Sequence, residues 1–379
     1  MKMLLGDLVE VISGFAFKSE LFSSDGGMPL IRIRDVLRSY SETFYTGDFD
    51  PKYLVTKGDI LVGMDGEFNS AEWSGVNSLL NQRVCKIVPD ETKLYSRYLL
   101  HFLPRHLKAI EDVTSFVTVK HLSVKDIRGI EIDLPPLEEQ KRIAAILDKA
   151  DSLRRKRAQA IALADDFLRA TFLDMFGDPV TNPKGWPVKP LGTLIEKIKS
   201  GWSAPSTDAE YIEGTLGVLK VSAVSSGYFK RAEAKVVDPS IVDRDLIFPV
   251  MGDLLFSRAN TRELVAAACL VEEDCESAFL PDKLWQITCS HGVARNEYLK
   301  FLLADLKFKD ELTKKATGTS GSMLNISQAK FVETNAPIPP YELQSRFADA
   351  VWRVYSLRKK WFESDYSIGN LFRGLSSDL

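Results

Sequence analysis

Two long segments of the chain place apolar residues three or four positions apart, the spacing typical of one face of an α-helix. Each segment opens on a pair of prolines, which suits a helix start because the first helical N–H groups have no partners within the helix. No proline or glycine then follows before Gly177, so the first helix can reach about 40 residues, about 60 Å at ~1.5 Å per residue. The stripe positions are Ile143, Leu147, Ala150, Ile161, Ala164, Leu168 and Met175 in the first segment, and Phe347, Val351, Val354, Trp361, Ile368, Phe372 and Leu375 in the second.

An apolar stripe of this length needs a partner, and the simplest partner for each long helix is the other one. Arg154 and Arg157 interrupt the first stripe, and Arg358 and Asp365 interrupt the second. The pattern therefore predicts two long antiparallel helices, at 138–177 and 338–379, that pack together in the manner of a coiled coil.

The two helical segments begin with the same phrase. Residues 134–156 read LPPLEEQKRIAAILDKADSLRRK and residues 338–360 read IPPYELQSRFADAVWRVYSLRKK, at a constant offset of 204 and with 10 of 23 pairs identical. Segments that precede these helices repeat as well: LLGDLVEVISG at 4–14 is echoed by PLGTLIEKIKSG at 190–201, and LVTKGDILVGMDGE at 54–67 by IFPVMGDLLFSRAN at 247–260. Two copies at so long a period indicate duplication of a whole domain rather than a solenoid.

Inside each copy the pattern is mixed. Apolar runs bounded by turn residues, at 29–36 and 83–88, predict strands. Segments 96–110 and 296–312 have helical periodicity, with a kink or break at Pro104 in the first. The prediction is an α+β protein with a pseudo-twofold internal repeat: a mixed domain at 1–137, a spacer helix at 138–177, a second mixed domain at 178–337 and a second spacer helix at 338–379.

Composition changes this picture little. Apolar residues make up 45% and charged residues 27% of the chain, enough for ordinary globular cores. No apolar run approaches the ~20 residues of a membrane helix, and the start MKMLLGDLVEV is too short and too acidic for a secretory signal, so we expect a cytoplasmic protein. The net charge of −3 does not by itself indicate a nucleic-acid binder, and a DNA-binding face would have to be a local patch of positive charge.

Signatures of catalysis are missing from the sequence. It contains no nucleotide-binding G-x-x-x-x-G-K-[ST] or G-x-G-x-x-G pattern, no H-E-x-x-H and no G-x-S-x-G. IPPY at 338–341 resembles a methyltransferase motif, but Ile338 stands where a hydrogen-bonding side chain is required, so we interpret it as a helix entry. We interpret Asp59 and Asp65, and likewise Asp243 and Asp245, as acidic turn residues. The four cysteines form no C-x-x-C pair and are expected to be reduced structural thiols.

The residues that remain carry a family resemblance. PPLEEQKRIAAILDKAD followed by a basic stretch resembles the hallmark of the specificity subunit of type I restriction–modification enzymes. KGDILVGMDGEF, LLNQRVCKI and VKHLSVKDIRGIEIDLPPL resemble that family's first target-recognition domain, and FGDPVTNPKGWPVKPLG resembles the junction into its second. The second copy departs from the pattern, because IPPYELQSRFADAV lacks the second glutamate and the IAAIL core.

The resemblance implies a non-catalytic subunit that recognises a split sequence in double-stranded DNA. Each target-recognition domain would read one half, and the two helices would separate the domains and dock two modification subunits. Those partners would bind S-adenosylmethionine and methylate adenine, and restriction subunits that use ATP and Mg²⁺ would be further partners. This chain itself would hold no cofactor and no metal, and would not contact a membrane.

Base reading requires side chains with fixed hydrogen-bond donors, whereas phosphate contacts supply affinity without sequence information. Residues of these types, in or beside loops that flank predicted strands, are the candidates. They are Lys18, Arg32, Arg34, Asn69, Lys120 and His121 in the first domain, and Lys199, Trp202, Lys220, Arg258, Asn260, Arg262, Ser322 and Asn325 in the second.

The basic stretches inside the two long helices have three interpretations. They bind phosphates between the half-sites, they contact the other helix or a partner subunit, or they form a solvated helix face. The residues concerned are Arg154, Arg155 and Arg157 in the first helix and Arg358 and Lys359 in the second. Arg154 and Arg358 occupy matching positions on the apolar stripes, which favours the contact, since burying either without a partner would be costly.

Two rival functions stay open on the sequence alone. A two-headed scaffold that binds other proteins would need the same architecture, and DNA affinity that falls steeply with salt would distinguish a DNA reader from it. A stand-alone enzyme has no motif in its favour.

Overall fold

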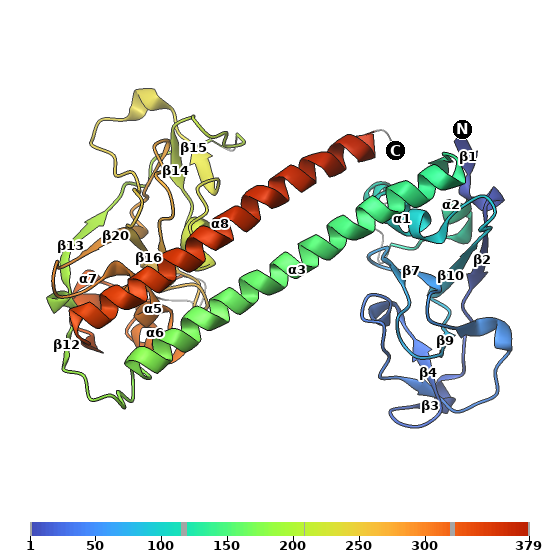
Figure 1. Cartoon of the computed structure of the whole chain (residues 1–379), viewed down its shortest axis with the longest axis horizontal. Coiled ribbons are helices and arrows are strands. Elements are labelled where there is room, and N and C mark those ends of the chain that lie inside the picture. Colours follow the sequence, from blue (N-terminus) through green and yellow to red (C-terminus); the bar gives the residue numbers. More distant parts are fainter. Residues whose placement is uncertain (1, 115–119, 208, 319–322, 378–379) are drawn as a thin grey trace. The chain divides into compact units, whose positions relative to one another are not determined.

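The structure is a computed structural model that describes residues 2–114, 120–207, 209–318 and 323–377, with side chains described as far as residue 361. It divides into two compact units, Met1–Lys156 with Tyr366–Leu379, and Arg157–Asp365. Each unit contains a mixed domain and part of each of two long helices (Figure 1). In these ranges no helix has both the length and the hydropathy needed to cross a lipid bilayer.

The described residues of the first unit form three sheets. A two-stranded sheet pairs β1 with β11, and a four-stranded antiparallel sheet has the order β2-β10-β7-β8. A five-stranded sheet has the order β3-β5-β4-β9-β6, and in it β4 and β9 are parallel. The strands are β1 (Lys2–Leu4), β2 (Val9–Ser13), β3 (Phe22–Ser23), β4 (Met28–Ile31), β5 (Phe44–Tyr45), β6 (Leu54–Val55), β7 (Ile60–Gly63), β8 (Ser70–Glu72), β9 (Ser78–Leu80), β10 (Val84–Pro89) and β11 (Glu131–Asp133).

The second unit repeats this topology. β12 pairs with β22 as β1 does with β11, the order β13-β20-β16-β18 matches β2-β10-β7-β8, and the parallel pair β14–β19 matches β4–β9. The strands are β12 (Val188–Pro190), β13 (Ile195–Ser200), β14 (Gly217–Leu219), β15 (Ala234–Val236), β16 (Leu254–Ser257), β17 (Ala259–Asn260), β18 (Ala268–Leu270), β19 (Ala278–Phe279), β20 (Leu284–Cys289), β21 (Leu324–Asn325) and β22 (Asn335–Pro337). The predicted internal duplication is therefore confirmed.

One glycine follows the second strand of each copy for a steric reason. A Cβ on Gly14 would lie 2.0 Å from the carbonyl oxygen of Asn81, and a Cβ on Gly201 would lie 1.8 Å from that of Leu280. Real Cβ atoms do not approach so closely, so the crossing of these two backbone segments requires glycine in both copies.

The helices of the two domains differ in one respect from the prediction. α1 (Ser96–Val113) continues through Pro104, so a break there is wrong. The corresponding segment of the second domain does break, into α5 (Asn296–Ala304) and α6 (Leu306–Lys314), where the Asp305 side chain accepts hydrogen bonds from the N–H groups of Lys307 and Phe308. An aspartate cap therefore divides the helix that lacks the proline. The short helices are α2 (Val124–Arg128), α4 (Ser222–Ser225) and α7 (Gln328–Val332).

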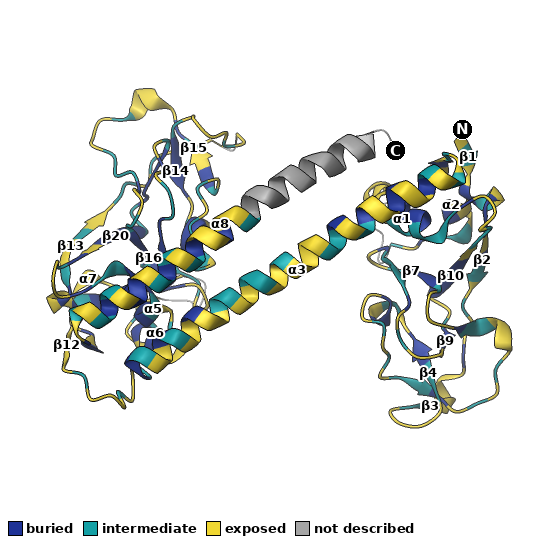
Figure 2. Cartoon of the chain, viewed as in Figure 1, coloured by how far each residue is buried: buried dark blue, intermediate teal, exposed yellow. Residues whose placement is uncertain are grey.

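The two predicted long helices are present. α3 spans Leu137–Phe176 and α8 spans Tyr341–Ser377, and each begins directly after the paired prolines. The predicted stripe positions of α8 beyond Trp361 lie outside the side chains described. Figure 2 shows buried and exposed positions alternating along α3, as expected for a helix that packs on one side.

The apolar stripe of α3 packs against more elements than the sequence pattern predicts. In the first unit Ile143 and Leu147 belong to the core of the mixed domain, together with residues of α1. In the second unit Phe172 lies 5.6 Å from Phe347 of α8, and also 5.7 Å from Tyr298 of α5, measured between ring centroids. The other long helix is thus only one of the partners, because each domain supplies much of the apolar surface that covers the stripe.

A buried glutamine fastens the first turn of each long helix to its domain. Gln140 accepts a hydrogen bond from the Tyr95 N–H (2.8 Å) and donates to the carbonyl oxygens of Lys93 (2.8 Å) and Pro135 (2.9 Å). Both this glutamine and its counterpart, 204 positions later, are fully buried.

The counterpart, Gln344, makes the same three bonds. It accepts from the Arg295 N–H (2.9 Å) and donates to the carbonyl oxygens of Val293 (3.1 Å) and Pro339 (2.8 Å). In both copies one side chain therefore joins the turn before α1 or α5, the paired prolines and the long helix.

We expect Gln344→Leu to lower the free energy of unfolding of the second unit by about 2–4 kcal/mol. Leucine has a similar size but leaves one buried N–H and two buried carbonyl groups without partners, each costing about 1–3 kcal/mol before relaxation. Urea unfolding followed by tryptophan fluorescence measures the change. Gln159→Leu, at an exposed position of α3, is the control, and an equal loss in both variants would contradict the anchoring role.

Candidate nucleic-acid interface

A carboxylate with a histidine and an arginine beside it lies in the loop after β7 in the first unit. The His121 Nδ1 atom lies 2.6 Å from Asp65 Oδ1, and the Arg83 Nε atom lies 3.2 Å from Asp65 Oδ2. His121 and Arg83 are each about half exposed, at 51% and 53% of the side chain. The network therefore presents donors and an acceptor to the solvent from three separate segments of the chain.

Hydrogen bonds to Lys120 and to the end of α1 hold the loop that carries Asp65. The Gly66 N–H donates to the carbonyl oxygen of Lys120 (3.0 Å), and the Lys120 ammonium group donates to the carbonyl oxygen of Glu111 at the end of α1. The Glu111 carboxylate accepts from the Phe68 N–H (3.3 Å) and from Lys108 (2.9 Å). Lys120, a predicted DNA contact, is thus partly engaged in fixing the loop.

The second unit has a comparable network with other residues. Arg258 donates through Nε to the carbonyl oxygen of Asp282 (2.8 Å) and through one terminal nitrogen to the Asn325 side-chain oxygen (2.9 Å). Its other terminal nitrogen lies 3.3 Å from the Asp282 carboxylate, which also accepts from the Ser203 hydroxyl. The structure therefore brings together two of the predicted residues, Arg258 and Asn325.

The two networks occupy the same point of the repeated fold. In the first unit the Met64 N–H donates to the carbonyl oxygen of Arg83 (3.0 Å), and the Met64 carbonyl accepts from the Leu122 N–H (2.8 Å). Arg258 makes the matching pair of bonds, to Lys283 (3.1 Å) and from Ile326 (2.8 Å). Met64 and Arg258 are therefore equivalent, and a buried core residue in one domain is replaced by a guanidinium group in the other.

Such networks have the chemistry for reading base edges. Arginine donates two hydrogen bonds to guanine, asparagine can both donate to and accept from adenine, and a carboxylate accepts from the cytosine amino group. Hydrogen bonds and charged contacts within each network hold these side chains in position. The two domains would present different sets of donors and acceptors on one scaffold.

The other candidates of the first domain have different partners from the Asp65, His121 and Arg83 side chains. Lys18 and Arg32 are exposed, and Arg34 is exposed with its Nε atom 3.7 Å from the Asp35 carboxylate. Asn69 is half-buried, and its carbonyl oxygen accepts from the Gly63 N–H. Nothing in these contacts assigns them to a DNA surface, so they remain predictions.

The remaining candidates of the second domain divide into exposed and structural groups. Lys199 and Arg262 are exposed, and the Lys220 ammonium group lies 3.8 Å from the Glu233 carboxylate. Asn260 is half-buried and accepts from the Thr261 N–H (2.8 Å). Ser322 lies outside the described residues.

Trp202 has mainly a packing role. Its ring stacks on Phe279, with 6.1 Å between centroids, and the Arg244 guanidinium group lies over it at 4.6 Å. Trp202 is part of a small apolar cluster that also contains Val218 and Val237. A direct role in DNA contact would have to use the edge that this cluster leaves accessible.

The basic residues of the long helices have different environments. Arg154 and Arg155 are exposed, with Arg154 3.6 Å from the Asp151 carboxylate, and Arg157 is half-buried. The Lys359 ammonium group lies 2.9 Å from the Glu273 carboxylate of the second domain.

Arg358, which matches Arg154 in the repeat, is instead buried. Its guanidinium carbon lies 3.0 Å from the centroid of the Tyr228 ring, and only 8% of the residue is exposed. Burial raises the pKa of the neighbouring Glu272, an effect that the positive charge of Arg358 partly offsets. Equivalent positions of the repeat therefore have different roles, and Arg358 contacts the second domain.

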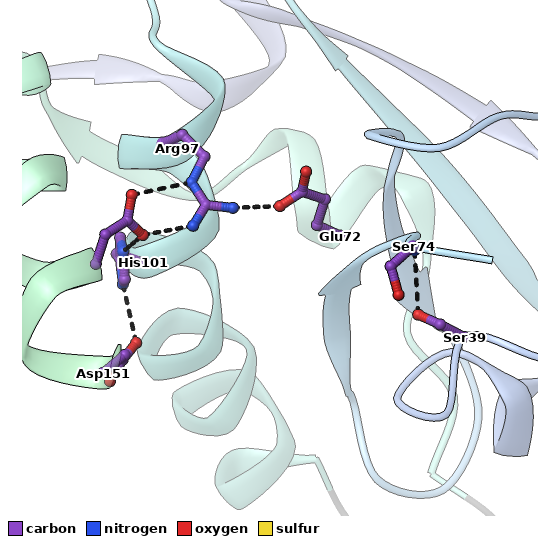
Figure 3. Close-up of polar contacts among 7 residues, drawn as sticks. Ser39, Glu72, Ser74, Arg97, His101 and Asp151 are labelled. Atoms are coloured by element: carbon purple, nitrogen blue, oxygen red, sulfur yellow. Dashed lines mark hydrogen bonds and ion pairs between the residues drawn. The ribbon is translucent and has the colours of Figure 1, made fainter. Parts of the chain in front are cut away.

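A polar cluster joins the first domain to α3. Figure 3 shows Arg97 of α1 with the Glu72 carboxylate of β8 beside it. The Arg97 Nε atom also lies 3.1 Å from Oδ2 of Asp148 in α3. The His101 Nε2 atom lies 2.9 Å from Asp148 Oδ1, and its Nδ1 atom lies 3.8 Å from Asp151. These contacts fix the rotation of α3 about its axis relative to α1, beyond the first turn held by Gln140.

Sequence reasoning missed Arg83, Asp65 and Asp282 as members of the two networks. The sequence predicted that both Asp59 and Asp65 are acidic turn residues. Asp59 has this role, since the Asp59 carboxylate accepts a hydrogen bond from the Thr56 N–H (2.7 Å). A signal was present in the repeat, because MDGE at 64–67 and RANT at 258–261 directly follow equivalent strands and both contain charged or hydrogen-bonding side chains.

Three further features concern possible catalytic or metal-binding groups: the IPPY segment, the cysteines and clusters of metal-ligating side chains. The IPPY segment leads into α8, and the Ile338 N–H donates to the carbonyl oxygen of Pro187, which confirms a helix entry. All four cysteines are buried free thiols, and burial raises the pKa of Cys85 and of Cys289 to about 12. Within the described part of the chain, no group of three or more His, Cys, Asp or Glu side chains could hold a metal ion.

Comparison with known proteins shows similarity to one class of protein, in sequence and in fold. The family described as type I restriction modification DNA specificity domain matches residues 1–163. The EcoBI specificity subunit of Escherichia coli is 42% identical over 175 residues, which cover 45% of this chain and 37% of that protein. The EcoKI specificity subunit of E. coli K12 is 22% identical over 380 residues, covering 91% of this chain and 80% of that one.

A solved structure gives the same result for the fold. The S subunit of a type I restriction-modification system from M. genitalium has a TM-score of 0.63 and 14% identity, covering 99% of this chain and 94% of that one. Residues 1–163 of this chain match the type I DNA specificity domain, and most of the chain is similar in sequence to type I specificity subunits. Its strong sequence match to EcoBI spans little more than a third of that relative's length.

The Arg97 cluster predicts a pH dependence for the attachment of α3. Burial acts to raise the pKa of Asp148, but the hydrogen bonds from Arg97 and His101 outweigh it and hold the pKa below its usual value. A lowered folded-state pKa stabilises the folded state above the unfolded pKa, near 3.8, and this stabilisation disappears as the pH falls through the folded value.

Acid titration of the unfolding midpoint in urea, between pH 6 and pH 3, tests this pH dependence. We expect Asp148→Asn to lower the midpoint of the first unit at pH 6 and to make the midpoint less dependent on pH below about 4. Asp166→Asn, at an exposed position of α3, is the control. A pH profile of Asp148→Asn parallel to that of the parent would contradict the role of the cluster.

Proposed function

We propose that this chain is a DNA-sequence specificity subunit that recognises a bipartite target, with one half-site read by each mixed domain. It directs partner subunits to methylate adenine or to cleave DNA, and it is itself non-catalytic. The observation that carries the proposal is the pair of polar networks at one position of a repeated fold, Asp65–His121–Arg83 and Arg258–Asn325–Asp282. A common scaffold with different polar side chains is what two unlike half-sites require.

The long helices are the surface on which we place the partners. Leu163 and Phe167 of α3 are 68% and 56% exposed, and Leu357 of α8 is 48% exposed. Large apolar side chains in such positions are typical of surfaces that another protein covers. We assign this surface to two modification subunits, and we place the complex in the cytoplasm.

The cofactors belong to these partners in the proposal. The modification subunits would bind S-adenosylmethionine, and restriction subunits would use ATP and Mg²⁺. The target adenine must leave the base stack to reach a methyl donor held elsewhere, and the specificity subunit would set which adenine does so.

Replacing one arginine in each network tests whether each domain reads one half-site. We expect Arg83→Ala to relax or abolish recognition of one half-site, and Arg258→Ala to do the same for the other. An arginine that reads guanine contributes about 1–3 kcal/mol of discrimination, roughly a fivefold to 150-fold effect. The measurement is a map of methylated adenines in a host that carries the variant with its modification subunit.

The control is Lys189→Ala, which removes an exposed positive charge from β12, outside both networks. Thermal unfolding of each variant separates loss of recognition from loss of the fold, because Arg258 also holds the 282 and 325 segments together. Either arginine variant altering both half-sites equally, or neither altering any, would contradict the assignment.

A further inference from the structure

The second unit contains a cavity of about 610 Å³ beside α3 that the DNA-reading function does not use. Its walls come from the C-terminal part of α3, from the loop at 226–228, and from α5 and the start of α6. Leu168, Phe172 and Phe301 supply apolar surface, and Tyr228 supplies a further ring. This volume lies within the range of sites that bind small molecules, about 300–1,000 Å³.

A buried lysine lines this cavity. Lys300 of α5 is only 6% exposed, and its ammonium nitrogen lies 4.0 Å from the centroid of the Phe301 ring and 5.5 Å from that of Tyr228. Among the residues that the structure describes, none forms a hydrogen bond or an ion pair with this ammonium group. Two aromatic faces offer some stabilisation, but a buried cation normally has a hydrogen-bonding anion beside it.

The carboxylates around the cavity already accept hydrogen bonds from other groups. Asp165 accepts from the Tyr228 hydroxyl, and Asp305 caps α6. Asp178 accepts from Lys307 and from the N–H groups of two residues that follow it. Asp165 still acts on Lys300 through its charge, against the dominant effect of burial, which lowers the pKa of Lys300 to about 8.

Two further positive charges lie at the wall of the cavity. Lys307 pairs with Asp178, and Arg169 of α3 lies 3.8 Å from Asp166 with both side chains 72% exposed. An exposed pair at that distance contributes little, so Arg169 can turn to an incoming anion at small cost. Lys300 inside and Arg169 at the edge therefore favour negative charge.

We propose that this cavity binds an amphiphilic anion, with a carboxylate, sulfonate or phosphate group on Lys300 and an aromatic or branched apolar body against Phe172 and Phe301. The ligand would contact α3 and α5 at once, so its binding would stabilise the packing of the long helix on the second domain. The proposal does not depend on DNA recognition, since it uses none of the residues of the two polar networks.

A matched pair of fluorescent probes tests the proposal on the full chain. 8-Anilino-1-naphthalenesulfonate has the required anionic group, and N-phenyl-1-naphthylamine is the same ring system without the sulfonate. We expect the sulfonate probe to bind saturably and about tenfold more tightly than the neutral probe, since hydrogen bonds to charged groups have effects of that order. We also expect it to raise the melting temperature.

Two variants assign the binding to the cavity. Lys300→Met retains the apolar stem and removes the charge, so it should abolish the preference for the sulfonate. Ala304→Trp, at an exposed position of α5 in the cavity wall, should obstruct both probes. Lys309→Met is the control, because Lys309 is a half-buried lysine of α6 that donates to the Glu263 carbonyl (2.8 Å) and does not line the cavity.

Equal affinities for the two probes would overturn the proposal, since they would mean adsorption on apolar surface alone. Unchanged sulfonate binding in Lys300→Met or in Ala304→Trp would overturn it as well. If Lys300→Met does not fold, the ratio of probe affinities in the parent chain and the Ala304→Trp variant decide the question.

Discussion

The architecture depends on how each long helix is attached to the domain that precedes it, and one buried glutamine side chain makes that attachment in both copies. Gln140 and Gln344 each satisfy three backbone groups that would otherwise be buried without partners. Hydrogen bonds of this kind have a modest net value when made and a large cost when missing. These hydrogen bonds therefore contribute mainly by fixing the direction in which each long helix leaves its domain, and less by adding net stability.

Around this shared attachment the two domains have diverged where they meet the solvent. The sheet order, the parallel strand pair and the glycine crossings recur, because each is required by core packing or by backbone approach. The loop after β7 and its equivalent after β16 carry different side chains on the same backbone bonds, as the Met64 and Arg258 positions illustrate. Surface loops on a rigid scaffold can change in this way without cost to the fold.

The sequence was sufficient to predict the elements that depend on local pattern. Helical spacing and paired prolines predicted α3 and α8, and the repeated phrase predicted the duplication, because periodicity reports directly which side of an element is covered. The split between α5 and α6 was missed, since it rests on the capping geometry of Asp305 and not on a helix-breaking residue.

The composition of the polar networks could be predicted only in part. His121 and Asn325 were chosen for their residue types, but Arg83 and Asp282 enter through a turn far from them in sequence, and only the folded chain brings these segments together. For the same reason the matching residues Arg154 and Arg358 could not be told apart, because the ring of Tyr228 that covers one of them comes from the second domain.

The most direct test of the account is a methylation map after exchange of one domain. Residues 1–137 would be replaced by the corresponding segment of another specificity subunit, and adenine methylation would be mapped in a host that also carries the modification subunit. The account predicts that one half of a split target changes, while the other half and the length of the gap stay the same. A change in both halves, or an unchanged target in a complex that demonstrably assembles, would contradict it.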